Sequence, residues 1–113
     1  MEDLTIILKA LSDSNRIRIL KMLEVKKLCV CEISFVLGLA NSTVSQHLSI
    51  LKEAGIIIEE KEGKWVNHRL AASPANSYVA DMLPLVKKWL VDDKTIRADL
   101  KKLDSTSRNM LCG

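Results

Sequence analysis

The 113-residue sequence contains little cysteine, and the placement of that cysteine argues against one class of protein. There are three cysteines, an odd number, and Cys29 and Cys31 are separated by a single residue. That spacing is too close for the disulfide framework that staples small secreted domains. We therefore expect reduced thiols in a reducing compartment.

Long hydrophobic runs are also missing. No apolar run approaches the ~20 residues that a membrane-spanning helix needs, and the acidic start at Met1 to Asp3 lacks the basic region of a signal peptide. We expect a cytoplasmic protein with no membrane partner.

Charge is nearly balanced, with a net charge of +3 and a pI near 8.8, so a local basic patch is compatible with nucleic-acid binding but is not required by composition. The apolar content of 48% is enough for one modest core. We expect one domain over residues 1–104, followed by a C-terminal tail over residues 105–113.

The first half of the chain has the pattern of four helices. Gly38 can adopt the left-handed conformation that ends a helix, and Asn41 is a favourable N-cap for the helix that Gly55 ends. A helix, a glycine-containing turn and a second helix outline a helix-turn-helix. The expected helices cover Leu4–Leu11, Asn15–Val25, Val30–Leu37 and the segment from Asn41 to Gly55.

The second half predicts a hairpin and further helices. Two β-prone runs, Ile56–Lys61 and Lys64–Leu70, flank Glu62-Gly63 and predict a β-hairpin wing. Ser73 and Pro74 suit the start of another helix, which Pro84 should kink or interrupt, and a last helix is expected over Asp93–Leu103. The terminal helices carry more apolar surface than so small a body can cover, which predicts a symmetric homodimer. The predicted fold class is mainly α with a small β-hairpin, a winged helix-turn-helix.

The helix that begins at Asn41 has the side chains of a DNA-reading helix. With Val44, Leu48 and Leu51 facing the core, its first turns present small hydroxyl and amide groups, and Gln46 has the paired donor and acceptor that adenine offers in the major groove. A solvated polar face is the alternative, but a basic wing beside the helix favours phosphate contact. The predicted DNA-binding residues are Ser42, Thr43, Ser45, Gln46, His47, Lys61 and Lys64.

Four segments carry a resemblance to a known family. They read Leu11-Ser-Asp-Ser-Asn-Arg-Ile-Arg-Ile-Leu, Leu28-Cys-Val-Cys-Glu-Ile, Asn41-Ser-Thr-Val-Ser-Gln-His-Leu-Ser-Ile-Leu-Lys-Glu-Ala-Gly-Ile-Ile and Glu62-Gly-Lys-Trp-Val-Asn-His-Arg-Leu. In register over residues 4–104, the chain resembles the ArsR/SmtB family of metal-responsive transcriptional repressors, of the arsenic-sensing type. The resemblance implies a homodimer that holds double-stranded operator DNA of a metalloid-resistance operon and releases it when metal binds. An enzyme is not expected, because no βαβ pattern or paired base accompanies the cysteines.

Cys29 and Cys31 are the candidate inducer ligands, since thiolates suit arsenite, antimonite and other thiophilic ions. At positions i and i+2 of a regular helix they would point about 200° apart, so one ion could join them only on extended or distorted backbone. Binding should therefore deform the segment that leads to the reading helix. Alternatively, both cysteines are buried core residues.

The expected inducer is As(III) or Sb(III), with no permanent cofactor. Arsenical members of the family usually have a third cysteine where this chain has Ser34, so either two thiolates suffice with a solvent ligand or Cys112 supplies the third. An idle terminal thiol is the alternative for Cys112. Two other sensing modes stay open: oxidation that pairs Cys29 or Cys31 with Cys112, and sensing of another soft metal such as cadmium or lead. No histidine lies between Ser77 and Asp93, where the family's zinc site would fall.

Overall fold

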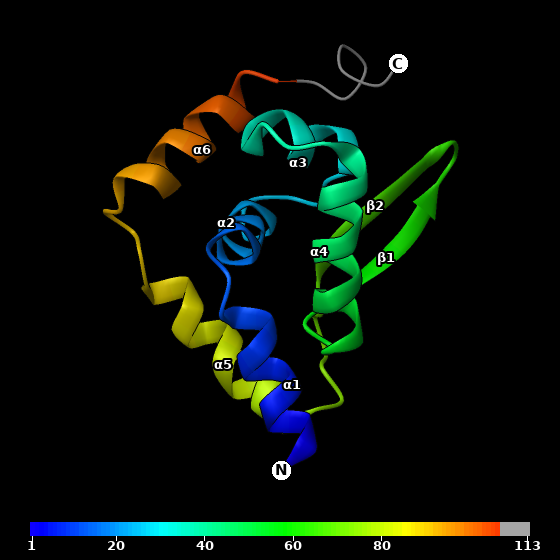
Figure 1. Cartoon of the computed structure of the whole chain (residues 1–113), viewed down its shortest axis with the longest axis vertical. Coiled ribbons are helices and arrows are strands. Elements are labelled where there is room, and N and C mark those ends of the chain that lie inside the picture. The colour runs from blue at the N-terminus through cyan, green and yellow to red at the C-terminus, as the bar shows by residue number, and fades with distance from the viewer. Residues whose placement is uncertain (107–113) are drawn as a thin grey trace.

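The computed structural model describes residues 1–106 and shows six helices and one two-stranded antiparallel sheet in that range (Figure 1). The order agrees with the sequence pattern: four helices, a hairpin, then two helices. The elements are α1 Glu2–Leu11, α2 Ser14–Leu23, α3 Val30–Leu37, α4 Asn41–Glu53, β1 Ile57–Glu62, β2 Trp65–Leu70, α5 Ser77–Lys88 and α6 Lys94–Asp104. The winged helix-turn-helix prediction is confirmed.

The core lies where α2, α3 and α4 meet, with the hairpin projecting from one side of the helical body (Figure 1). Removal of aliphatic side chains from water is the main favourable contribution to folding here. The core is completed by the base of the hairpin and by residues of α5 and α6. Its largest fully buried apolar side chains are Ile19, Leu20, Met22, Leu28, Ile33, Val44, Leu51, Ile56, Ile57, Val79 and Leu103.

Gly38 ends α3 as expected, with φ of 70° in the left-handed region. The expectation that Asn41 caps α4 is wrong. The N-cap is Ala40, because its carbonyl already accepts the Val44 N–H at 3.1 Å and the helix therefore begins one residue earlier.

The expected start of α5 at Ser73 and Pro74 is also wrong. The helix begins later because the Asn76 side-chain oxygen accepts the backbone N–H of Tyr78 at 2.8 Å and that of Val79 at 3.4 Å. The helix then continues past Pro84 to Lys88 without interruption. At α6, Asp93 is the N-cap and accepts the Ile96 N–H at 3.1 Å.

The hairpin turn lies one residue later than expected. Glu62 pairs with Trp65, so the two-residue turn is Gly63-Lys64, and Gly63 takes φ of 62°. A further pair extends this sheet. Leu28, just before α3, forms an antiparallel bridge with His68 of β2 through two backbone hydrogen bonds of 3.0 and 2.7 Å.

Two outer helices, α1 and α5, lie side by side at the end of the body where the N-terminus lies (Figure 1). Both carry exposed apolar side chains, including Leu8 of α1 at 57% and Leu85 of α5 at 45%. Towards the other end of the body, α6 is joined to α2 by a bidentate ion pair in which Arg18 donates two hydrogen bonds of 2.8 Å to Asp99 (Figure 1). Within residues 1–106, no helix is long and apolar enough to cross a membrane.

Candidate DNA interface and thiol site

Helix α4 has two distinct faces. Val44, Leu48 and Leu51 are buried against the core, as the spacing predicted. The face left over is polar and accessible, which is what contact with a DNA groove requires. It consists of the exposed side chains of Ser42, Ser45, Gln46 and Ser49 and the partly exposed Thr43.

His47 lies apart from this face. Its side chain is only 15% exposed, its Nδ1 atom lies 3.2 Å from the guanidinium of Arg16, and it lies 3.9 Å from the Asp13 carboxylate. Both partners belong to the start of α2. The ring of His47 therefore faces the protein interior, unlike the neighbouring Gln46.

The hairpin carries the basic side chains expected of a wing. Lys61 and Lys64 are exposed, and neither forms an ion pair with another residue of the described range 1–106. The Lys64 ammonium lies 4.9 Å from the centre of the Trp65 ring, a cation–π contact that leaves the charge at the surface. Both lysines are available for phosphate contact at the tip of the hairpin.

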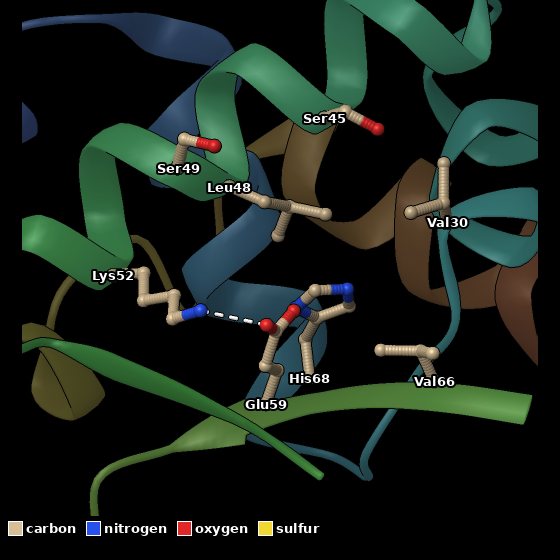
Figure 2. Close-up of a pocket in the computed structure, with 8 residues that line it drawn as sticks. All are labelled: Val30, Ser45, Leu48, Ser49, Lys52, Glu59, Val66 and His68. Atoms are coloured by element: carbon tan, nitrogen blue, oxygen red, sulfur yellow. Dashed lines mark hydrogen bonds and ion pairs between the residues drawn. The ribbon is translucent and has the colours of Figure 1, made fainter. Parts of the chain in front are cut away.

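A hollow of about 240 Å³ separates α4 from the hairpin (Figure 2). Across it, the Lys52 ammonium donates to the Glu59 carboxylate at 2.6 Å, which lowers the pKa of Glu59. The ring of His68 lies beside this pair and is 6% exposed, and burial lowers its pKa. Its Nδ1 atom has no hydrogen-bond partner within residues 1–106.

Cys29 occupies the N-cap position of α3, with extended backbone at φ −92° and ψ 166°. It is 4% exposed, and its backbone N–H donates to the Glu32 carboxylate at 3.0 Å in a capping box. Burial is the main cause that raises the pKa of the Cys29 thiol. The first cysteine is thus on extended backbone at the helix start, whereas Cys31 lies inside the first turn of α3.

Cys31 is in the first turn of α3, partly buried and held in a disulfide bond. One turn further, the hydroxyl of Ser34 is buried with no hydrogen-bond partner inside the described range. Within residues 1–106, no three His, Cys, Asp or Glu side chains form a ready-made metal site. Cys112, the third candidate ligand, lies outside the described residues.

The cysteine segment is connected to both parts of the candidate DNA interface. Helix α3 packs directly against α4. Leu28, the residue before Cys29, is hydrogen-bonded to His68 of the wing, and Lys27 forms an ion pair with Glu62 at the wing tip. The segment that leads into α3 is therefore in direct contact with the hairpin, and α3 itself is in direct contact with α4.

Sequence reasoning missed Glu32, Leu28 and His68 as parts of this arrangement. Glu32 could have been found, because an acidic residue three positions after a helix N-cap is the signature of a capping box, here with cysteine in place of serine or threonine. The Leu28–His68 bridge joins positions 40 residues apart by backbone atoms alone, and such a pairing leaves no local signal in the sequence.

The helix-turn-helix and its wing define the class: a winged-helix DNA-binding protein. Comparison with known proteins then gives the family. Residues 13–59 match the family model described as bacterial regulatory protein, arsR family. The chain is 30% identical over 105 residues to the arsenical resistance operon repressor of Escherichia coli (strain K12), covering 90% of this chain and 80% of that protein. The chain belongs to the ArsR family and is a DNA-binding transcriptional repressor.

Two further similarities bear on ligand and assembly. A cadmium resistance transcriptional regulatory protein CadC homolog of Staphylococcus aureus is 39% identical over 66 residues, covering 60% of this chain and 57% of that protein. The solution structure of Mb0332 from Mycobacterium bovis, described as a homodimeric winged helix-turn-helix DNA-binding domain, has a TM-score of 0.65 and 27% identity, and the match covers 82% of each chain. The chain is therefore similar to regulators of more than one metal response.

Proposed function

We propose that this protein represses a metalloid-resistance operon and leaves its operator when As(III) or Sb(III) binds the thiolates of Cys29 and Cys31. The observation that carries the proposal is the position of Cys29. It is the N-cap of the helix that packs on α4, and the residue before it is bonded to the wing. Similarity to the Escherichia coli arsenical repressor supports the same ligand.

The chemistry of capture follows from the two thiols in their reduced form. Each thiol replaces one hydroxyl of arsenous acid: an As–S bond forms, an As–O bond breaks, and the thiol proton leaves in a water molecule. Two such exchanges leave one hydroxyl on arsenic, unless Cys112 replaces it. To bring both sulfurs to one arsenic, the backbone around Cys29 must move, which disturbs its hydrogen bond to Glu32 and its neighbour's bridge to His68.

Release then follows from linkage between the two sites. Arsenic favours the distorted backbone of the cysteine segment, whereas DNA favours the arrangement of α4 and wing that the undistorted segment supports. A ligand shifts such an equilibrium only by its difference in affinity for the two states, and each tenfold loss of operator affinity requires about 1.4 kcal/mol of that difference.

For the DNA side of the function we assign base and phosphate contacts to separate elements. Gln46 contacts a base edge, the hydroxyls of Ser42, Thr43 and Ser45 contact phosphates near the start of α4, and the wing tip adds two cations. These wing cations are Lys61 and Lys64.

We further propose that the working form is a cytoplasmic homodimer built through α1 and α5. A groove of about 330 Å³ between these helices and α2 is lined almost wholly by apolar side chains, among them Leu11, Leu20 and Trp89. A second copy of the chain would cover the exposed apolar side chains of both helices. We assign residues 1–104 to this DNA-binding and dimerisation domain.

An operator-release assay tests the proposal. A fluorescent duplex selected by the reduced wild-type protein from a randomised library is titrated with arsenite, antimonite, cadmium, lead and zinc, using wild type, Cys112→Ser and the double variant Cys29→Ser/Cys31→Ser. We expect arsenite and antimonite to release the wild type and to leave the double variant bound. Release of the double variant by arsenite would overturn the assignment, and an unaltered response of Cys112→Ser would show that two thiolates suffice.

The pH dependence of operator release distinguishes arsenite from cadmium in the same assay. Because Cys29 has a raised pKa, Cd²⁺ must displace its proton, so cadmium capture should weaken as the pH falls. Arsenite capture releases water and should change little over the same range. A steep loss of arsenite response on acidification would contradict the exchange chemistry above.

A thiol-oxidation sensor is a second candidate function, favoured by the disulfide bond of Cys31. Formation of such a bond from two thiols transfers two electrons and two protons to an oxidant such as hydrogen peroxide, which becomes two water molecules. Mass spectrometry after mild oxidation, run beside the arsenite titration, separates the two functions. If peroxide abolished operator binding while stoichiometric arsenite left it unchanged, the oxidation sensor would replace the metalloid sensor.

A further inference from the structure

Arg16 connects three helices through one side chain. Its Nε atom donates to the carbonyl of Ala10 at 2.7 Å, and a second nitrogen donates to the carbonyl of Lys9 at 3.1 Å. These carbonyls belong to the last turn of α1, where the partial negative charge of a helix end attracts a cation. The side chain of Arg16 therefore binds the C-terminal end of α1.

The backbone of Arg16 anchors the same residue to the start of α2. Its N–H donates to the N-cap carboxylate of Asp13 at 3.0 Å. With its backbone held by Asp13 and two side-chain nitrogens held by α1, the guanidinium has little freedom to reorient. Its remaining nitrogen lies 3.2 Å from Nδ1 of His47, near the middle of α4.

The protonation pattern of this last contact is set by arginine chemistry. A guanidinium only donates hydrogen bonds and stays charged at any physiological pH. Nδ1 of His47 must therefore accept, which places the ring proton on Nε2. The contact is directional, and it is made by the residue next to Gln46.

We propose that Arg16 and His47 are positioning residues that fix the rotation of α4 about its axis and couple it to α1, without touching DNA themselves. The inference rests on α4 being the reading helix. On such a helix a rotation of a few degrees moves the base-contacting atoms off their partners, whereas phosphate attraction tolerates it. Helix α1 also carries the exposed Leu8 of the predicted dimer interface. A displacement of α1 when the dimer forms would therefore be transmitted to α4 through the contact between Arg16 and His47.

The test measures specificity rather than binding alone. Arg16→Lys keeps the charge and loses the planar, multi-pronged geometry, and His47→Ala removes the acceptor while Arg16 keeps its hold on α1. Arg97→Lys, an exposed arginine on α6, is the matched control. Wild type, the single variants and the double variant Arg16→Lys/His47→Ala are titrated with the selected duplex and with a scrambled duplex of equal length and composition.

We expect both single variants to lose about tenfold in the ratio of selected to scrambled affinity, the size of one charge-assisted hydrogen bond, with scrambled affinity held within about twofold. The double variant should lose little beyond either single one, and Arg97→Lys should match wild type. Additive losses would mean that His47 contacts DNA directly, and unchanged ratios would mean that the contact is packing only; either result overturns the proposal. If Arg16→Lys fails to fold, the His47→Ala ratio alone decides. A wild type that binds both duplexes equally would instead refute α4 as the reading helix.

Discussion

Replacing Cys29 by serine should abolish the response to arsenite and leave folding intact. Serine is among the best N-cap residues, so Cys29→Ser should preserve the start of α3 and its partner Glu32. The same substitution removes one of the two proposed sulfur ligands. We expect a protein that folds, binds its selected duplex like wild type and no longer releases it with arsenite.

The magnitude follows from the position of the residue. Exchange of one N-cap side chain for another, as in Cys29→Ser, should change the free energy of unfolding by less than ~1 kcal/mol. Loss of the capping side chain in Cys29→Ala should lower it by about 1 kcal/mol. If Cys29 were only a buried apolar residue, introducing a hydroxyl at a site with 4% exposure would cost about 1–3 kcal/mol instead. Urea denaturation of reduced wild type, Cys29→Ser and Cys29→Ala measures these differences.

Cys29→Ser should be at least as stable as Cys29→Ala and close in stability to wild type. A loss of about 2 kcal/mol or more in the serine variant, with the alanine variant close to wild type, would refute the capping role. Arsenite release that persists in Cys29→Ser at wild-type concentrations would refute the ligand role, whatever the stability.

Three further predictions address the other parts of the site. Gln46→Ala should reduce the preference for the selected duplex by about 1–3 kcal/mol, measured by competition binding; an unchanged sequence preference would make Gln46 a phosphate contact. Ser34→Cys should tighten arsenite binding, because a third thiolate one turn after Cys31 would replace a hydroxyl that has no partner within residues 1–106. Thiolate-to-arsenic absorbance titrations, with Ser34→Ala as control, measure this, and equal affinities would count against a site on α3. Burial holds the pKa of His68 below its ordinary 6.5, so the unfolded chain takes up the proton first and the free energy of unfolding should fall as the pH drops below about 6.5. Urea denaturation between about pH 7 and about pH 5.5 should show this slope, and a slope in His68→Asn as steep as in wild type would assign it to other groups.

The elements of this fold were predictable because their signals are local. Apolar periodicity located α3 to the residue, and Gly38 ended it where only a left-handed conformation fits easily. Helix starts were less predictable, since several polar residues compete for the cap. Asn76 outcompeted Ser73, and Ala40 capped α4 by its backbone alone.

The polar connections of the site could not be predicted, because they join residues far apart in the sequence. His47 was expected at the DNA surface, and nothing nearby in sequence indicates that Arg16 turns the ring toward α2. The proposed ligand roles of Cys29 and Cys31 rest on thiolate chemistry together with the family resemblance, because chemistry and spacing alone fit two buried core residues equally well. The structure adds the extended backbone at Cys29, which periodicity alone does not specify.

The most direct test of the central claim is an arsenite titration of the protein bound to its selected duplex, followed by fluorescence anisotropy under reducing conditions. If Cys29 and Cys31 are the sensor, wild type should leave the DNA as arsenite approaches one equivalent per protomer, and Cys29→Ser/Cys31→Ser should stay bound at a large excess. Wild type that remains on the DNA at that excess, or a double variant that dissociates with it, would contradict the account.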